Sequence, residues 1–167
     1  VEVDNLWLPD VFGYSAALPQ ILKKSGVNYF LTQKLSWSQY NEFPHHTFNW
    51  RGIDGSEVLT HFPPENTYNS ELDTEFLIPA QKHFKEKAYL DEFISLFGVG
   101  NGGGGPKPEN IELGHRMSNL ESSPKVKFDL ARNFFKRLDK NKESLETWVG
   151  ELYLELHRGT LTCLLYT

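Results

Sequence analysis

Short apolar runs and amphipathic segments take turns along the chain, and their order predicts an α/β fold. Runs of apolar, aromatic and β-branched residues predict strands, whereas apolar positions three or four residues apart predict helices. Strands are expected at 6–8, 27–32, 43–50, 56–62, 93–99, 126–128 and 148–156. Helices are expected at 15–24, 71–87, 108–120 and 130–138. This order is typical of a parallel sheet or barrel with helices on the outside.

Local signals sharpen several of these elements. Asp54-Gly55 lies between two of the expected strands and favours a tight hairpin turn. Pro79 lies inside an expected helix and should kink or interrupt it. Leu130, Phe134 and Leu138 are four residues apart and would form one apolar helical face.

Composition narrows the classes of function. The 167 residues are 39% hydrophobic and 23% charged, which is ordinary for one globular domain. Aromatic residues reach 14%, which suits a core and also suits a site that stacks on sugars. The net charge of −5 argues against a nucleic-acid partner. No apolar run approaches the length of a membrane span, so no membrane partner is expected.

The ends and the single cysteine give further expectations. Cys163 stands alone, which excludes an internal disulfide and fits a reducing compartment. The first residues lack the pattern of a signal peptide and lack an initiator methionine. We therefore expect a cytoplasmic chain that is a piece of something longer.

Polar residues stand at three expected strand ends. Asp10 follows Leu8-Pro9, Gln33-Lys34 follows the next strand, and Gly100-Asn101 follows a third. Such ends meet at one edge of a parallel sheet, so these groups could converge on a carboxylate site. The competing interpretation of Asp10 is an aspartate that helps the chain turn.

Other polar and aromatic candidates have simpler explanations. The glycine run 102–105 lacks the spacing of a phosphate-binding loop. His45 and His46 are adjacent and would point to opposite faces of a strand, so they do not suggest one metal site. His61 is better read as a core histidine with a satisfied hydrogen bond.

Lysine and aromatic side chains leave two interpretations open. Lys34 near a carboxylate would favour its ionised form, although most lysines are simply exposed. Trp37, Trp50 and Tyr68 could stack on a sugar, although most tryptophans belong to the core.

One segment and several ordered blocks resemble a known family. The segment Trp7-Leu8-Pro9-Asp10-Val11-Phe12-Gly13-Tyr14-Ser15-Ala16 resembles the nucleophile segment of the class II α-mannosidases, glycoside hydrolase family 38, and the nearest branch is the cytosolic type. Further matching blocks lie in order at 30–37, 43–48, 61–64 and 150–160, with the glycine run as a sixth.

The resemblance implies a fold, a reaction and roles for four residues. It implies part of a seven-stranded β/α barrel of the glycoside hydrolase/deacetylase type, and a zinc-dependent, retaining exo-α-mannosidase. Asp10 matches the family's nucleophile, which is also a zinc ligand. Phe12 would lie beside the bound sugar, Lys34 matches a cation that contacts the nucleophile, and Tyr68 matches a tyrosine that lines the site.

Three departures from the family pattern qualify this picture. Asn101 stands where the cytosolic-type branch has an aspartate that is the candidate acid/base, and an amide cannot deliver a proton. The family's other zinc ligands, a His and an Asp upstream and a His downstream, would lie outside this chain. Residues 1–160 therefore match the central and C-terminal part of the catalytic β/α domain, and 161–167 form a divergent tail.

The expected function is that of a fragment of an α-mannosidase, inactive alone. Its parent would hydrolyse terminal α-mannose from oligosaccharides, using zinc and the rest of the catalytic chain. The alternative is a non-catalytic mannosidase-like module that binds a sugar or a partner, which Asn101 favours. A polysaccharide deacetylase-like barrel is a weaker third interpretation, because the chain has no His-x-x-x-His pair.

Overall fold

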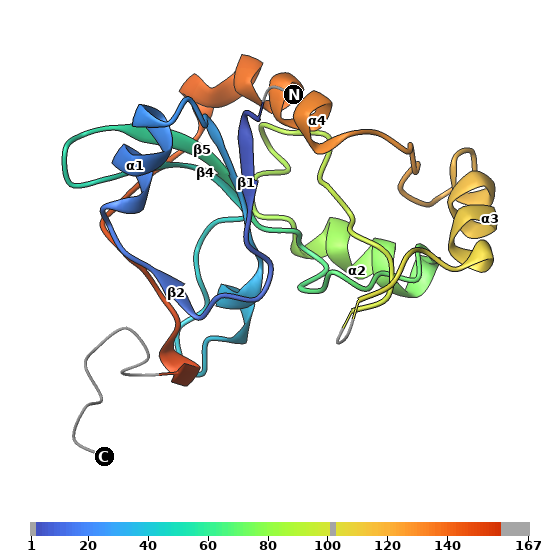
Figure 1. Cartoon of the computed structure of the whole chain (residues 1–167). Helices are drawn as coiled ribbons and strands as arrows, with labels where there is room; N and C mark the ends of the chain where they lie inside the picture. The colour runs from blue at the N-terminus through green and yellow to red at the C-terminus, as the bar shows by residue number, and fades with distance from the viewer. Residues whose placement is uncertain (1–2, 101–102, 158–167) are drawn as a thin grey trace.

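A five-stranded mixed sheet forms the framework of the protein, in a computed structural model that describes residues 3–100 and 103–157 (Figure 1). The strand order is β1-β3-β5-β4-β6. The strands are β1 (Asn5–Trp7), β3 (Tyr29–Leu31), β5 (Glu57–His61), β4 (Thr47–Arg51) and β6 (Thr147–Val149). β1, β3 and β5 run parallel, β4 is antiparallel to β5, and β6 is parallel to β4.

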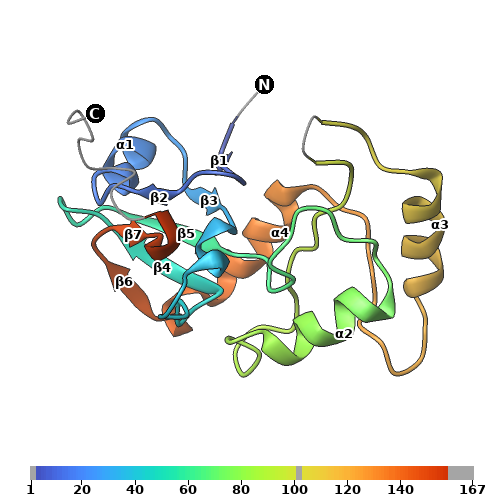
Figure 2. The same cartoon turned by 90° about the horizontal axis from the view of Figure 1, so that it is seen from below.

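Shorter elements surround this sheet. β2 (Gly13–Tyr14) pairs antiparallel with β7 (Leu152–Tyr153) in a second, two-stranded sheet. The α-helices are α1 (Leu18–Lys24), α2 (Thr74–His83), α3 (Pro108–Met117) and α4 (Ala131–Leu138). The 3₁₀ helices are η1 (Lys34–Trp37), η2 (Asp139–Ser144) and η3 (Glu155–His157). Figure 2 shows α2 and α3 to one side of the five-stranded sheet. Among the helices in the described ranges, none has the length and apolarity needed to cross a membrane.

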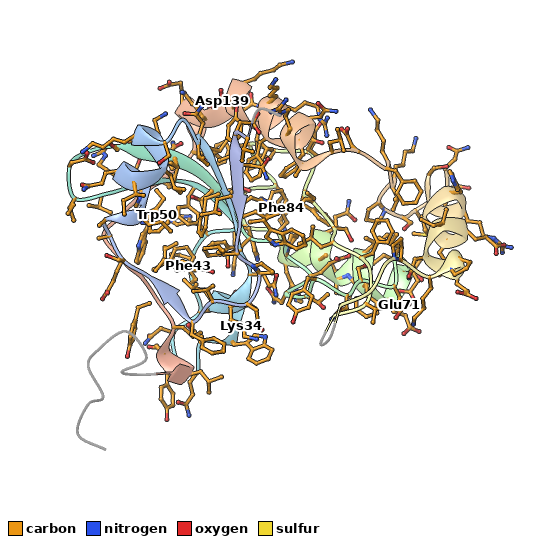
Figure 3. All side chains as sticks on the ribbon, in the orientation of Figure 1. Lys34, Phe43, Trp50, Glu71, Phe84 and Asp139 are labelled. Atoms are coloured by element: carbon orange, nitrogen blue, oxygen red, sulfur yellow. The ribbon has the colours of Figure 1, made fainter. Side chains whose placement is uncertain are left out.

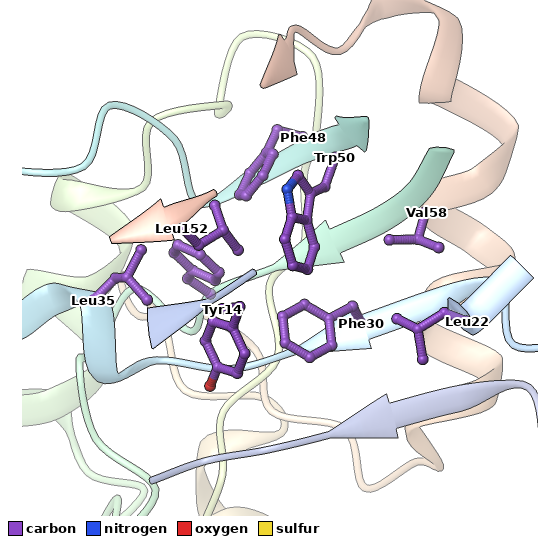
Figure 4. Packing of buried hydrophobic residues seen from close by; sticks show 9 residues of the cluster. Tyr14, Leu22, Phe30, Leu35, Phe48, Trp50, Val58 and Leu152 are labelled. Carbon is purple, nitrogen blue, oxygen red and sulfur yellow. The ribbon is translucent and has the colours of Figure 1, made fainter. Parts of the chain in front are cut away.

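Apolar side chains cover both faces of the sheet. Successive side chains on a strand point to opposite faces, so one strand contributes to both apolar clusters. Phe30 belongs to one apolar cluster, whereas its neighbours Tyr29 and Leu31 belong to the other. The first cluster joins the sheet to α1 and the β2–β7 pair, as Figure 4 shows from close by. Its members are Tyr14, Leu22, Phe30, Leu35, Phe48, Trp50, Val58, Phe62 and Leu152. The second cluster packs α4 against the opposite face.

Most of the expected elements are present within a few residues of their predicted ends. The hairpin turns at Asp54-Gly55, as predicted, and each expected helix forms in a shorter version. α2 continues through Pro79, so this proline does not interrupt the helix. The described strands form an open sheet, and closure into a seven-stranded barrel stays a prediction.

Three strand predictions were wrong in whole or in part. Residues 93–99 and 126–128 form no strand. The amide of Ile94 instead donates to His61 Nε2 at 3.4 Å, and Phe93, Ile94 and Leu96 pack on the second core, so the apolar run reflects burial without strand pairing. Residues 148–156 divide between two sheets and η3, because Gly150 turns the chain with a φ of 109°.

Candidate functional site

The carboxyl ends of β1 and β3 bring Asp10 and Lys34 into contact. Asp10 Oδ1 lies 2.5 Å from Lys34 Nζ. The two strands are parallel neighbours, with Trp7 opposite Leu31, so the chain leaves both at the same edge of the sheet. The sequence-based expectation that these two strand ends converge is therefore confirmed.

Hydrogen bonds fix the backbone that leads to Asp10. The amide of Leu8 donates to the carbonyl of Leu31 at 3.0 Å. The carbonyl of Leu8 accepts from Thr32 Oγ1 at 2.7 Å and from the Tyr14 hydroxyl at 2.8 Å. Burial raises the pKa of Tyr14 to about 12, which keeps the hydroxyl protonated and able to donate well above neutral pH. Pro9 and Asp10 thus continue from an anchored residue.

Lys34 is a buried cation with two aromatic neighbours. Its side chain is only 7% exposed, whereas that of Asp10 is 56% exposed. Lys34 Nζ lies 3.5 Å from the centroid of the Trp37 ring and 5.5 Å from that of Phe12. Cation–π attraction therefore holds the ammonium from one side while Asp10 contacts it from another. The interpretation of Lys34 as an ordinary exposed lysine is wrong.

The aromatic candidates fall in different places. Trp50 is fully buried and belongs to the core, whereas Trp37 is half-exposed and gives one face of its ring to Lys34. Tyr68 lies in the segment that follows β5, against Gly100: a Cβ built on that glycine would be 2.5 Å from Tyr68 Cε2. Asn101, the position of the candidate acid/base, lies outside the described residues.

Two histidines, His46 and His61, are buried in the core. His61 is fully buried, its Nδ1 is 2.8 Å from Thr47 Oγ1, and its Nε2 accepts from the Ile94 amide. Burial lowers the pKa of His61 well below its usual value. Burial also lowers the pKa of His46 to about 4, and its Nδ1 accepts from the Lys85 amide. The prediction of His61 as a satisfied core histidine is confirmed.

Two carboxylates of interest were not found from the sequence. Glu86 accepts from the amides of His46 and Thr47 and is 6% exposed. Glu65 accepts from Ser95 Oγ at 2.8 Å and from Ser70 Oγ at 3.1 Å, and burial raises its pKa to about 7. Glu65 follows Pro63-Pro64 at the end of β5, much as Asp10 follows Pro9 after β1, and this repeated pattern could have drawn attention to it.

The described residues do not form a metal site. No group of three or more His, Cys, Asp and Glu side chains gathers anywhere in 3–100 and 103–157. A catalytic zinc needs about three protein ligands, and Asp10 supplies one carboxylate that already contacts Lys34. This set of donors does not fit a zinc ion by itself.

Two surface hollows lie at the other end of the sheet, away from Asp10 and Lys34. They have volumes of about 200 and 250 Å³ and share Asn49, Glu57 and Lys142 in their walls. Asp139, which lines the larger one, and Lys34 are at opposite ends of the molecule in Figure 3. The polar groups of these hollows are mostly paired with one another, as in the ion pair of Arg51 and Glu57.

Comparison with known proteins identifies the family to which this chain belongs. Residues 1–151 match the model of the glycosyl hydrolases family 38 N-terminal domain. Alpha-mannosidase G of Dictyostelium discoideum is 49% identical over 95% of this chain and 14% of its own length. Alpha-mannosidase 2C1 of Homo sapiens is 48% identical over 95% of this chain and 15% of its own length. The chain thus spans about a seventh of the length of these relatives.

A solved structure supports the fold. The crystal structure of an alpha-mannosidase from Enterococcus faecalis V583 matches 90% of this chain and 18% of its own, with a TM-score of 0.62 and 18% sequence identity. At that identity the likeness concerns the fold alone, and it supports the mixed α/β architecture. The family model covers 151 of the 167 residues, and the relatives agree with it. The chain belongs to glycosyl hydrolase family 38, the class II α-mannosidases, within the cytosolic-type branch.

Proposed function

We propose that this chain is part of the catalytic domain of a retaining exo-α-mannosidase that removes terminal α-mannose from oligosaccharides in the cytoplasm. The contact between Asp10 and Lys34, at the carboxyl ends of adjacent parallel strands, is the observation that carries the proposal. In this proposal the chain works within a longer polypeptide, the parent protein, because its relatives are about seven times as long.

Asp10 would act as the nucleophile. Its half-exposed carboxylate is accessible to a substrate, and the buried Lys34 ammonium gives it a fixed counter-charge. A carboxylate oxygen would form a bond to the anomeric carbon of mannose while the glycosidic C–O bond breaks. Water would then hydrolyse the glycosyl–Asp10 ester and regenerate the carboxylate. Phe12, beside Lys34, would pack along one side of the sugar, and Tyr68 would line the site.

The leaving oxygen also needs a proton, and this chain does not supply the expected donor. Retaining hydrolysis uses a second carboxyl group about 5–5.5 Å from the nucleophile. Asn101 stands at the position of the candidate acid/base, and its amide cannot give up a proton under these conditions. We therefore propose that the isolated chain is inactive, and that in the parent the proton comes from another carboxyl group.

Zinc is the proposed cofactor of the parent protein, with Asp10 as one ligand. A bound zinc would neutralise charge near the nucleophile and hold sugar hydroxyls. We propose that its remaining ligands come from outside this chain, and within 3–100 and 103–157 no cluster of donors is present to hold it.

Mass spectrometry of the parent protein tests the central role. A fluorinated mannosyl fluoride should leave one mannosyl adduct on Asp10, since such reagents slow hydrolysis of the covalent intermediate. Asp10→Gly should lose about 10³-fold or more in kcat, and azide, a small external nucleophile, should restore part of it. The exposed Asp91 supplies the control variant, Asp91→Asn, which should behave as the wild type. An adduct on a different residue would overturn the assignment of Asp10.

A non-catalytic module that binds a sugar is the second candidate, and Asn101 favours it. A parent protein that binds an α-mannoside in calorimetry but releases no mannose, before and after Asn101→Asp, would support it. Turnover by the parent would exclude it.

A further inference from the structure

The two arms of the glycine-rich segment lie side by side. The amide of Val99 donates to the carbonyl of Gly104 at 3.4 Å. A Cβ built on Gly104 would lie 2.9 Å from the Cβ of Val99, so the two arms are in close contact. We call residues 95–100 the incoming arm and residues 103–107 the outgoing arm. The two arms are therefore held together at Val99 and Gly104.

The segment between β5 and α2, residues 62–73, holds the incoming arm through Glu65. One carboxylate oxygen of Glu65 accepts from Ser95 Oγ at 2.8 Å. The other accepts from Ser70 Oγ at 3.1 Å, and Ser70 in turn donates its amide to the carbonyl of Leu96 at 2.9 Å. The segment therefore bonds the incoming arm at two points: Glu65 bonds it at Ser95, and the Ser70 amide, whose side chain Glu65 holds, bonds it at Leu96.

The same segment holds the outgoing arm through Glu71, which Figure 3 labels. Glu71 Oε2 accepts from Asn110 Nδ2 at 3.1 Å, and Glu71 Oε1 lies 3.6 Å from Lys107 Nζ. The side chain of Asn110, at the start of α3, also accepts from the amide of Lys107 at 3.0 Å. A second carboxylate thus fixes the point where the chain leaves the glycine-rich segment.

Between these two carboxylates the segment carries Tyr68 and Asn69, which press against the incoming arm. A Cβ on Gly100 would lie 2.5 Å from the Tyr68 ring and 2.7 Å from Asn69 Oδ1. Only a glycine allows this approach. The position of Tyr68 and that of the glycine-rich segment are consequently coupled.

We propose that Glu65 and Glu71 are positioning residues, which hold the two arms of the glycine-rich segment against Tyr68 at the end of the sheet that carries Asp10. The proposal rests on the proposed glycosidase function, since it assigns Tyr68 to the sugar site. Removing a carboxylate such as Glu65 partly from water is unfavourable unless donors meet it, and each of its oxygens accepts from a serine. If this position only filled space, an apolar side chain would be more favourable there. A carboxylate that accepts from Ser70 and Ser95 instead sets the positions of both serines.

The test uses the parent protein with Glu65→Ala, Glu65→Gln and Glu71→Ala. Exposed Glu109 in α3 supplies the matched control, Glu109→Ala. Hydrogen exchange measures the arms directly, and kcat and KM on an α-mannoside measure the consequence. The glutamine variant can still accept from one serine and donate to the other, so it is the conservative variant.

For Glu65→Ala we expect amide exchange in the incoming arm, where its partner Ser95 lies, to rise by about tenfold while exchange in the β4–β5 hairpin is unchanged. We expect kcat to fall by about tenfold to a hundredfold, with Glu65→Gln within about threefold of the wild type. Glu71→Ala should loosen only the outgoing arm, because its partners are Lys107 and Asn110.

Two results would overturn the positioning role. One is unchanged exchange in the incoming arm of Glu65→Ala. The other is faster exchange with unchanged kcat and KM, which would make the contacts structural only. A wild-type parent without any turnover would instead overturn the proposed function, and the exchange data would still decide whether the two carboxylates hold the arms.

Discussion

The Asp10–Lys34 pair is asymmetric, because Lys34 is buried and Asp10 is half-exposed. Asp10→Ala would leave a buried ammonium without its carboxylate and should lower the free energy of unfolding by roughly 2 kcal/mol. Lys34→Met would leave a carboxylate that water can reach and would keep the packing on Trp37, so its cost should stay below about 1 kcal/mol. Urea unfolding of both variants measures the difference. A larger loss for Lys34→Met than for Asp10→Ala would contradict this account of the pair.

Glu65 makes stability depend on pH. Burial raises the pKa of Glu65 from 4.5 to about 7, so the folded state binds a proton that the unfolded state has lost in this range. Its contribution therefore weakens as pH rises from about 4.5 to about 7, by up to about 3 kcal/mol, and levels off above that. Asp73 adds to the shift by charge repulsion, whereas Ser70 and Ser95 oppose it.

Unfolding free energies of the wild type and Glu65→Gln, measured from pH 4 to pH 8, isolate this effect. The other titrating groups, including the buried His46 and His61, are common to both proteins and cancel in the difference. The difference should move in favour of the glutamine variant as pH rises. A flat difference between pH 4.5 and pH 7 would rule out the raised pKa.

At this scale the sequence predicted that Asp10 and Lys34 lie together, but it did not predict which side chains surround them. Asp10 and Lys34 could be placed together, because adjacent parallel strands end at the same edge. The burial of Lys34 beneath Trp37 could not be foreseen, since it depends on the turn of η1 after β3. Glu65 was missed because its serine partners at 70 and 95 lie outside the helices and strands of the structure, where sequence spacing does not indicate which side chains meet.

Among the elements, the β4–β5 hairpin was the most predictable and offers a clean test. Gly55 has a φ of 83°, its amide donates to the carbonyl of Gly52, and Ser56 donates its amide to Asp54 Oδ1. A Cβ at Gly55 meets nothing within 4 Å, so Gly55→Ala should act through backbone strain alone.

We expect Gly55→Ala to lower the free energy of unfolding by roughly 1 kcal/mol. Gly105 is the matched control, because a Cβ there is also free of contacts and no positive φ opposes it. Gly105→Ala should therefore be neutral or slightly stabilising. Equal effects of the two substitutions in thermal unfolding would show that the turn does not need the left-handed conformation.

The wrongly predicted strands at 93–99 and 148–156 have different physical causes. Residues 93–99 are apolar because they cover the second core, yet Ile94 donates its amide to the His61 ring and not to a neighbouring strand. Periodicity reports burial, and it cannot report which partner takes a backbone amide. Residues 148–156 were divided by Gly150, whose positive φ redirects the chain between two sheets.

For the whole molecule, the main question is how much of a catalytic site one segment can carry. The chain matches relatives of which it covers 14–15%, and its described strands form an open sheet with both faces covered. The nucleophile candidate and its cation follow the carboxyl ends of two adjacent strands, so they need only this segment. A metal site that draws ligands from distant segments needs more of the chain.

Zinc binding distinguishes what this chain can form alone, the Asp10–Lys34 pair, from a metal site that needs the parent protein. Among the described residues only Asp10 is a proposed ligand, and no cluster of three donors surrounds it. The 167-residue chain should therefore bind zinc with a dissociation constant of about 10⁻⁴ M or higher, much more weakly than a site with three protein ligands. The parent protein should bind one zinc tightly, and Asp10→Ala should weaken that binding at least tenfold, because one of its ligands is lost. Isothermal titration calorimetry on the chain, the parent and the parent variant measures all three affinities.

The matched variant Asp91→Asn should leave the affinity of the parent unchanged, since Asp91 is exposed and no ligand role is proposed for it. Stoichiometric zinc binding by the chain alone at micromolar concentration would show that the ligands lie within this segment after all.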